Sequence, residues 1–176
     1  MAAGRFSRRH LLAGLVSAGL LSGCGFKLRG MDGVQANYKT VYLRFDASVP
    51  FELQQALRQN LTRAGVQEVE VIADAELMIE LGVFGRQISR TSRSETGQTT
   101  AELIRFSQQV QAYRLDNEAQ IMDTEQVVMR DRQLDPNQRM AAERELQSIT
   151  QAMLQNLARQ ILDSVNRAYV AEALAR

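Results

Sequence analysis

Alternating apolar and polar positions predict four β-strands, because a half-buried strand points successive side chains to opposite faces. One strand is expected at residues 39–45, and three more follow further along the chain, at 75–87, 99–115 and 119–130. The row expected to be buried along the second strand consists of Leu77, Ile79, Leu81 and Val83. Residues 116–118, with the sequence Asp-Asn-Glu, indicate a tight turn between the last two strands.

The strand at 99–115 has two faces of different character. One face carries apolar side chains, namely Ile104, Phe106, Val110 and Ala112. The other face carries polar ones, namely Arg105, Ser107, Gln109 and Gln111. The polar face is therefore expected to meet solvent or to serve a function.

Two amphipathic helices are expected from apolar residues spaced three and four apart. The first follows Ser48 and Pro50, which supply a cap and a fixed backbone angle, and it ends at Gly65. The second spans roughly residues 135–171. Its apolar stripe consists of Met140, Leu146, Ile149, Met153, Leu157, Ile161 and Val165.

The predicted order is strand, helix, three strands, helix. Three consecutive strands joined by short turns form an antiparallel meander, and amphipathic helices cover one face of such a sheet. The sequence therefore predicts an α+β fold, a two-layer sandwich with a four-stranded, mostly antiparallel sheet and both helices on one face.

The first residues have the layout of a bacterial lipoprotein signal. Three cations, Arg5, Arg8 and Arg9, precede an apolar run at residues 11–21. The run is about half as long as a membrane-spanning helix requires. Small residues then lead to Cys24, the only cysteine, at the position where a lipoprotein is cleaved and acylated. The alternative is that Cys24 is an ordinary small buried residue.

This interpretation divides the chain into three parts. Residues 1–23 are expected to be the signal peptide, 24–37 an acylated start and tether, and 38–176 a single domain. Gly25 follows the cysteine, whereas an Asp there would resemble the retention signal of inner-membrane lipoproteins. The expected location is thus the periplasmic face of the outer membrane. Residues 7–12 also resemble a twin-arginine export signal, so this route and the Sec route both stay open.

Composition narrows the function further. Without residues 1–23 the chain has 18 basic and 20 acidic residues, a balance of about −2 that argues against nucleic-acid binding. The only histidine, His10, leaves with the signal, and Cys24 is acylated. These losses exclude histidine-dependent nucleophiles and the usual zinc sites. No catalytic residue, metal or cofactor is expected beyond the covalent lipid.

A periplasmic hydrolase is the alternative enzyme class. Its candidate carboxylate pairs are Glu143 with Asp131 and Asp116 with Glu118. Nothing in their spacing signals an acid and a base with separated pKa values, so capping and solubility explain these charges better.

Residues 89–100 are rich in hydroxyl groups and basic toward their start. They are typical of a solvated hairpin tip. The same stretch also suggests a phosphate-recognising tip, because Arg86, Arg90 and Arg93 could donate forked hydrogen bonds to anionic groups.

The segment CGFKLRG at residues 24–30 resembles the acylated start of the LptE family of lipopolysaccharide-assembly lipoproteins. The resemblance continues at 97–102, at the Asp-Pro-Asn turn of 135–137 and in the Gln- and Arg-rich last helix. It implies a non-enzymatic partner of LptD, a large outer-membrane β-barrel, in which LptE sits as a plug and binds lipopolysaccharide. A lipid-anchored scaffold of another envelope complex is the other non-enzymatic interpretation.

The resemblance and the residue types together suggest two groups of site residues. The candidates for binding lipopolysaccharide are Arg86, Arg90, Arg93, Arg139 and Arg144. The candidates for contacting the barrel, whose lumen is polar, are Ser94, Thr96, Gln98, Arg105 and Gln109. The family has a basic residue directly before a Gly-Gln pair. This chain departs from that pattern, because Glu95-Thr96 precedes its Gly-Gln pair at 97–98. Helix-surface pairs with nearby glutamates explain the arginines at 139 and 144 better than a ligand role does.

Overall fold

The computed structural model describes residues 36–135 and 138–175, without the side chain of Arg139. The predictions for residues 1–35, lipidation of Cys24 among them, lie outside the described residues. Within the described ranges, no helix is both long enough and apolar enough to cross a membrane. The elements, in chain order, are β1 (Thr40–Phe45), α2 (Phe51–Arg63), β2 (Gln67–Glu68), the 3₁₀ turn η2 (Ile72–Asp74), β3 (Leu77–Arg93), β4 (Thr99–Arg114), β5 (Ala119–Gln133) and α3 (Arg139–Leu174).

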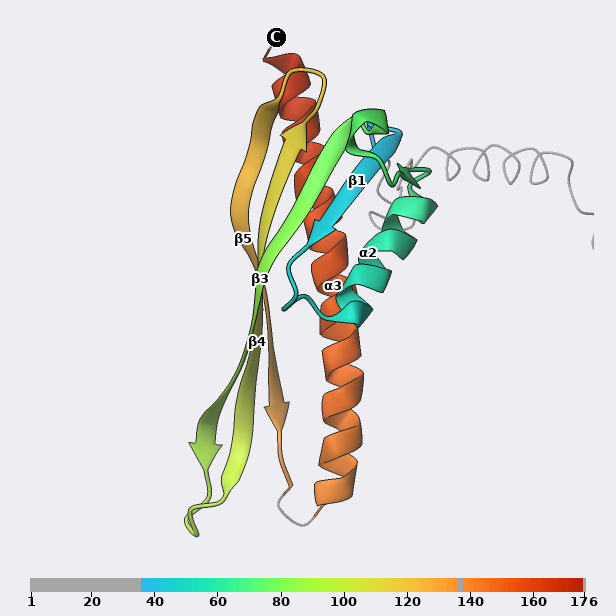
Figure 1. Cartoon of the computed structure of the whole chain (residues 1–176). Helices are drawn as coiled ribbons and strands as arrows, with labels where there is room; N and C mark the ends of the chain where they lie inside the picture. Colours follow the sequence, from blue (N-terminus) through green and yellow to red (C-terminus); the bar gives the residue numbers. More distant parts are fainter. Residues whose placement is uncertain (1–35, 136–137, 176) are drawn as a thin grey trace, which may run out of the picture. The chain divides into compact units, whose positions relative to one another are not determined.

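The predicted α+β sandwich is confirmed. Both helices lie on one side of a sheet with the strand order β2-β1-β3-β4-β5 (Figure 1). β3, β4 and β5 form the expected antiparallel meander, while β1 pairs in parallel with both β2 and β3. The sheet has five strands instead of four, because β2 adds two residues whose pairing is too short to leave an alternating pattern in the sequence.

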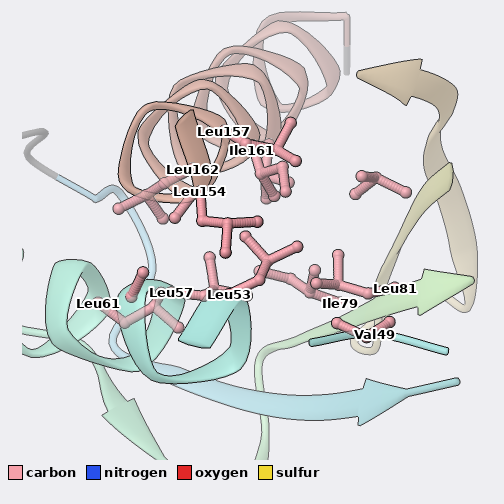
Figure 2. Close-up of a cluster of buried hydrophobic side chains, with 14 of the residues drawn as sticks. Val49, Leu53, Leu57, Leu61, Ile79, Leu81, Leu154, Leu157, Ile161 and Leu162 are labelled. Atoms are coloured by element: carbon pink, nitrogen blue, oxygen red, sulfur yellow. The ribbon is translucent and has the colours of Figure 1, made fainter. Parts of the chain in front are cut away.

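The hydrophobic core fills one half of the sandwich, where α2 and α3 pack against β1, β3 and β4. Figure 2 shows the leucines of α2 at 53, 57 and 61 pointing toward Leu157 and Ile161 of α3 and Ile79 of β3. All of these side chains are 0–1% exposed. The predicted stripe of α3 is thereby confirmed at its centre, and α2 is amphipathic as expected. Met140 is an exception at 68% exposure, because the first turns of α3 have no second helix beside them (Figure 1).

A β-bulge in β3 changes which side chains face the helices. The pairing of β3 with β4 shifts between Leu81 and Phe84, and the extra residue reverses the alternation of the strand. Val83 is therefore 64% exposed, and the prediction that it is buried is wrong. Phe84 takes the helix-facing position instead and packs against Phe106, with the ring centroids 5.5 Å apart.

Two polar side chains hold this bulge. Gln108 is 0% exposed, and its Nε2 donates to the carbonyl oxygens of Gly82 at 2.8 Å and of Gln109 at 2.9 Å. The Oγ of Ser48 accepts the backbone N–H of Phe84 at 3.0 Å. The prediction that Ser48 caps α2 is thus wrong, because its hydroxyl is engaged at the bulge and Pro50 occupies the N-cap position.

An arginine clamp attaches the start of α3 to the far half of the sheet. Arg132 of β5 donates from Nε and Nη2 to one carboxylate oxygen of Glu102 on β4, at 3.0 and 2.7 Å. Its Nη1 donates to the carbonyl oxygen of Ala142 in α3 at 2.9 Å. The side chains of Arg132 and Glu102 are only 8% and 16% exposed. One guanidinium therefore ties β4, β5 and α3 together.

Candidate functional site

The β3–β4 hairpin projects past the start of α2 and ends in a hydrogen-bonded turn (Figure 1). The backbone N–H of Ser94 donates to the carbonyl oxygen of Gln98 at 2.8 Å, and that of Gly97 donates to Ser94 at 2.9 Å. Gly97 has a φ of +79°, a left-handed conformation that glycine adopts without strain. β3 continues to Arg93, so Arg90 and Arg93 lie on a strand and not in the loop.

The hydroxyl groups of this turn are partly engaged with one another. The Oγ of Ser94 lies 2.9 Å from Oγ1 of Thr96 and accepts the N–H of Gln98 at 3.2 Å. The Oγ1 of Thr100 donates to the Oγ of Ser92 at 3.0 Å. The side chains of Thr96 and Gln98 are exposed. The tip is thus an ordered polar surface that can still donate and accept hydrogen bonds.

A cationic face forms where the sheet extends beyond the core. Strand register places Arg90, Glu102 and Arg132 in one row across three strands. Arg86 and Arg130 lie on the same face, and both are exposed. The four guanidinium groups outnumber the one carboxylate of this set, so we name these five residues the cationic face.

Sequence reasoning singled out Arg86 and Arg90 of this face but missed Arg130 and Arg132. A signal for them exists in the alternation of β5, because both follow the buried Val128 at steps of two residues. The predicted strand ended at residue 130, and this early end hid the continuation of the row.

The other predicted residues lie elsewhere. Arg105 and Gln109 are on the sheet face away from the helices, where Arg105 Nη2 lies 3.3 Å from a carboxylate oxygen of Glu125. Arg144 is exposed on α3, while the side chain of Arg139 is outside the described residues. The predicted barrel-contact residues are thus divided between the hairpin tip and the outer face of the sheet.

One of the two candidate carboxylate pairs is separated by the sheet. Asp131 lies on the outer face of the sheet, whereas Glu143 belongs to α3 on the other side. Asp116 accepts a hydrogen bond from Nε of Arg114 at 3.0 Å. The same guanidinium donates from Nη1 to Glu172 at 2.7 Å, and this hydrogen bond raises the pKa of Arg114. Across residues 36–135 and 138–175, no cluster of three or more potential ligands suits a metal ion.

Comparison with protein families finds one match. The sequence model of the family LptE, described as lipopolysaccharide-assembly, matches residues 38–165. Curated protein sequences include none that matches the chain.

Solved structures with the same fold include several lipoproteins. Rare lipoprotein B from Shewanella oneidensis is 20% identical with a TM-score of 0.66, covering 78% of this chain and 100% of its own. An uncharacterized lipoprotein B from Nitrosomonas europaea is also 20% identical, with a TM-score of 0.68, covering 86% and 96%. A minor lipoprotein from Acinetobacter baumannii is 20% identical, with a TM-score of 0.60, covering 74% and 92%. At this identity the likeness shows the fold alone.

Proposed function

The chain belongs to the LptE family of lipopolysaccharide-assembly proteins, and we propose that it acts at the outer membrane as the partner of a large β-barrel of the LptD type. In this role it plugs the barrel, assists its assembly and binds lipopolysaccharide on the way to the outer leaflet. LptE proteins are non-enzymatic, and the chain is therefore not an enzyme. A lipid on Cys24, exposed by removal of residues 1–23, would hold it on the periplasmic face of the membrane.

The projecting hairpin is the observation that carries this proposal. Barrel lumens of the porin class are polar, so a segment inserted into one needs a surface of hydrogen-bonding groups. The hairpin extends beyond α2 and ends in the exposed polar side chains of Thr96 and Gln98 (Figure 1). The outer face of the same strands carries Arg105 and Gln109, which supply more such groups.

The cationic face supports the binding of lipopolysaccharide. Lipid A and the inner core carry phosphates, and guanidinium groups bind phosphate through two parallel hydrogen bonds. Arg90 belongs to this face and is separated from the turn by two residue pairs, while Arg93 is the last residue of β3. The proposed binding surface therefore adjoins the proposed barrel contact.

We expect the double substitution Arg90→Gln with Arg93→Gln to weaken lipopolysaccharide binding roughly tenfold, since it removes two charged donors of phosphate hydrogen bonds. The yield of the complex with the barrel should be unchanged, because glutamine keeps a polar tip. Binding is measured by titrating purified lipopolysaccharide, and assembly by co-purification with the barrel.

The matched control is Arg63→Gln with Arg159→Gln, which removes two exposed charges from α2 and α3. This control should leave both measurements unchanged. Unaltered lipopolysaccharide binding by the hairpin variant would contradict the role of its arginines and favour a purely structural plug.

A further inference from the structure

A groove lies between the sheet and the two helices, at the level where α2 begins. Its volume is about 630 Å³, within the roughly 300–1,000 Å³ range of small-molecule sites. The start of α2 forms one wall and residues 146–155 of α3 form the other. The floor is formed by Phe84 and Arg86 of β3 and by Phe106 of β4.

The bulge in β3 determines which side chains form the floor of this groove. After the bulge, Phe84 and Arg86 occupy the helix-facing positions, opposite Gln108 and Phe106 of β4. Without the extra residue, the exposed Val83 would face the helices in place of Phe84. Leu154, 4% exposed, completes the apolar lining from α3.

The groove holds one cation beside this apolar floor. The guanidinium carbon of Arg86 lies 6.0 Å from the centroid of the Phe106 ring, at the outer limit of a cation–π contact. Among the described residues, Arg86 forms no ion pair with a carboxylate. Glu52 is the acidic side chain in the lining. The helix walls otherwise present uncharged amides, from Gln55, Gln59, Gln147, Gln151 and Gln155.

We propose that this groove binds one fatty acyl chain of a phosphorylated lipid, with the phosphate at Arg86. An acyl chain needs no hydrogen bonds along its length, which suits a floor of Phe84, Phe106 and Leu154. The phosphate meets the one guanidinium, and the glutamine amides can hydrogen-bond to ester or sugar oxygens near it. The inference rests on the proposed lipopolysaccharide function and adds a place for a chain, which the hairpin arginines do not provide.

Dodecyl phosphate, used below its micellar concentration, tests the groove by calorimetric titration. The protein is the chain from residue 24 onward with Cys24→Ser, so that no attached lipid competes. We expect one dodecyl phosphate per chain, with octyl phosphate binding at least tenfold more weakly because four fewer methylenes are buried. Inorganic phosphate, which has the charge without the chain, should give no measurable binding, and neutral dodecyl maltoside should bind about tenfold more weakly.

Substitutions locate the site. Arg86→Gln should weaken dodecyl phosphate binding about tenfold, and Glu52→Gln should strengthen it about two- to fivefold by removing an opposing charge. Thr150→Trp, on the α3 wall, should abolish it by filling the groove while leaving Arg86 in place. Arg159→Gln, which removes an exposed charge from α3 outside the groove, is the matched control and should bind as the unsubstituted chain does. Thermal unfolding confirms that each variant is folded.

Equal binding of octyl and dodecyl phosphate, or unchanged binding by folded Arg86→Gln and Thr150→Trp, would overturn the proposal. The proposal would also be overturned if the unsubstituted chain self-associated and Thr150→Trp abolished that self-association. A second copy of the chain would then occupy the groove. These outcomes leave the proposed function intact if the double variant Arg90→Gln with Arg93→Gln binds lipopolysaccharide more weakly than the unsubstituted chain. Failure of the unsubstituted chain to bind lipopolysaccharide would instead count against the proposed function itself.

Discussion

Replacing Leu157 by alanine is expected to lower the free energy of unfolding by about 3–5 kcal/mol. Leu157 lies at the centre of α3 with 0% of its surface exposed, facing the leucines of α2 and the helix-facing side of β3 (Figure 2). Truncation removes buried methyl groups and leaves a cavity. The surrounding side chains of α2, α3 and β3 are closely packed and cannot move enough to fill it. Urea denaturation followed by circular dichroism measures the change.

Leu174→Ala is the matched control, since it is the same substitution in the same helix at a site that is 83% exposed. It should change the free energy of unfolding by less than about 0.5 kcal/mol. Equal effects of the two substitutions would contradict a core held between α2, α3 and the sheet.

Replacing Arg132 by glutamine should lower the free energy of unfolding by about 3 kcal/mol. The guanidinium binds Glu102 through two nitrogens and the carbonyl oxygen of Ala142 through the third. Glutamine is too short to reach both acceptors, and the carboxylate of Glu102, 16% exposed, is left without its cation. Hydrogen exchange of the first turns of α3 should rise together with the loss of stability, because the same arginine attaches that end of the helix.

Arg130→Gln provides the control for the clamp. It removes the same charge from the same face of β5, two residues away, where the side chain is exposed. We expect less than about 0.5 kcal/mol of destabilisation and unchanged exchange in α3. If Arg130→Gln and Arg132→Gln behaved alike, net charge would explain the result and the clamp would not.

Periodicity predicted the layers of this fold but not the points where the period breaks. Strands and helices can be predicted because burial makes every second side chain of a strand apolar, and side chains three and four apart in a helix. The bulge after Leu81 obeys no such rule, since it depends on Gln108 and Ser48 arriving from other elements to bind its backbone. The exposure of Val83 could therefore not be predicted from its own strand.

Parts of the candidate site were also predictable from the sequence, and other parts were not. The hairpin and its polar tip were predictable, because a glycine and hydroxyl residues between two alternating runs signal a turn. The cationic face could not be predicted without the register of three strands. Arg132, for example, pairs with Glu102, which lies 30 residues earlier in the chain. The groove at Arg86 combines four elements, so no local pattern could indicate it.

The two halves of the sheet have different roles. The half covered by α2 and α3 contains the core and provides stability. The other half presents the polar hairpin and the cationic face, and the groove lies at the border of the core, between the sheet and both helices. The proposed function uses both halves, because the core keeps the domain folded while the surface beyond it is available for the proposed contacts with a barrel and an anionic glycolipid.

The most direct test of the proposed function is a detergent pull-down of the tagged lipoprotein from its own cell envelope, with the bound proteins identified by mass. The proposal predicts a large β-barrel protein in near-stoichiometric amount. Recovery of no barrel, or of an inner-membrane transporter in its place, would contradict the plug and favour a scaffold of another envelope complex.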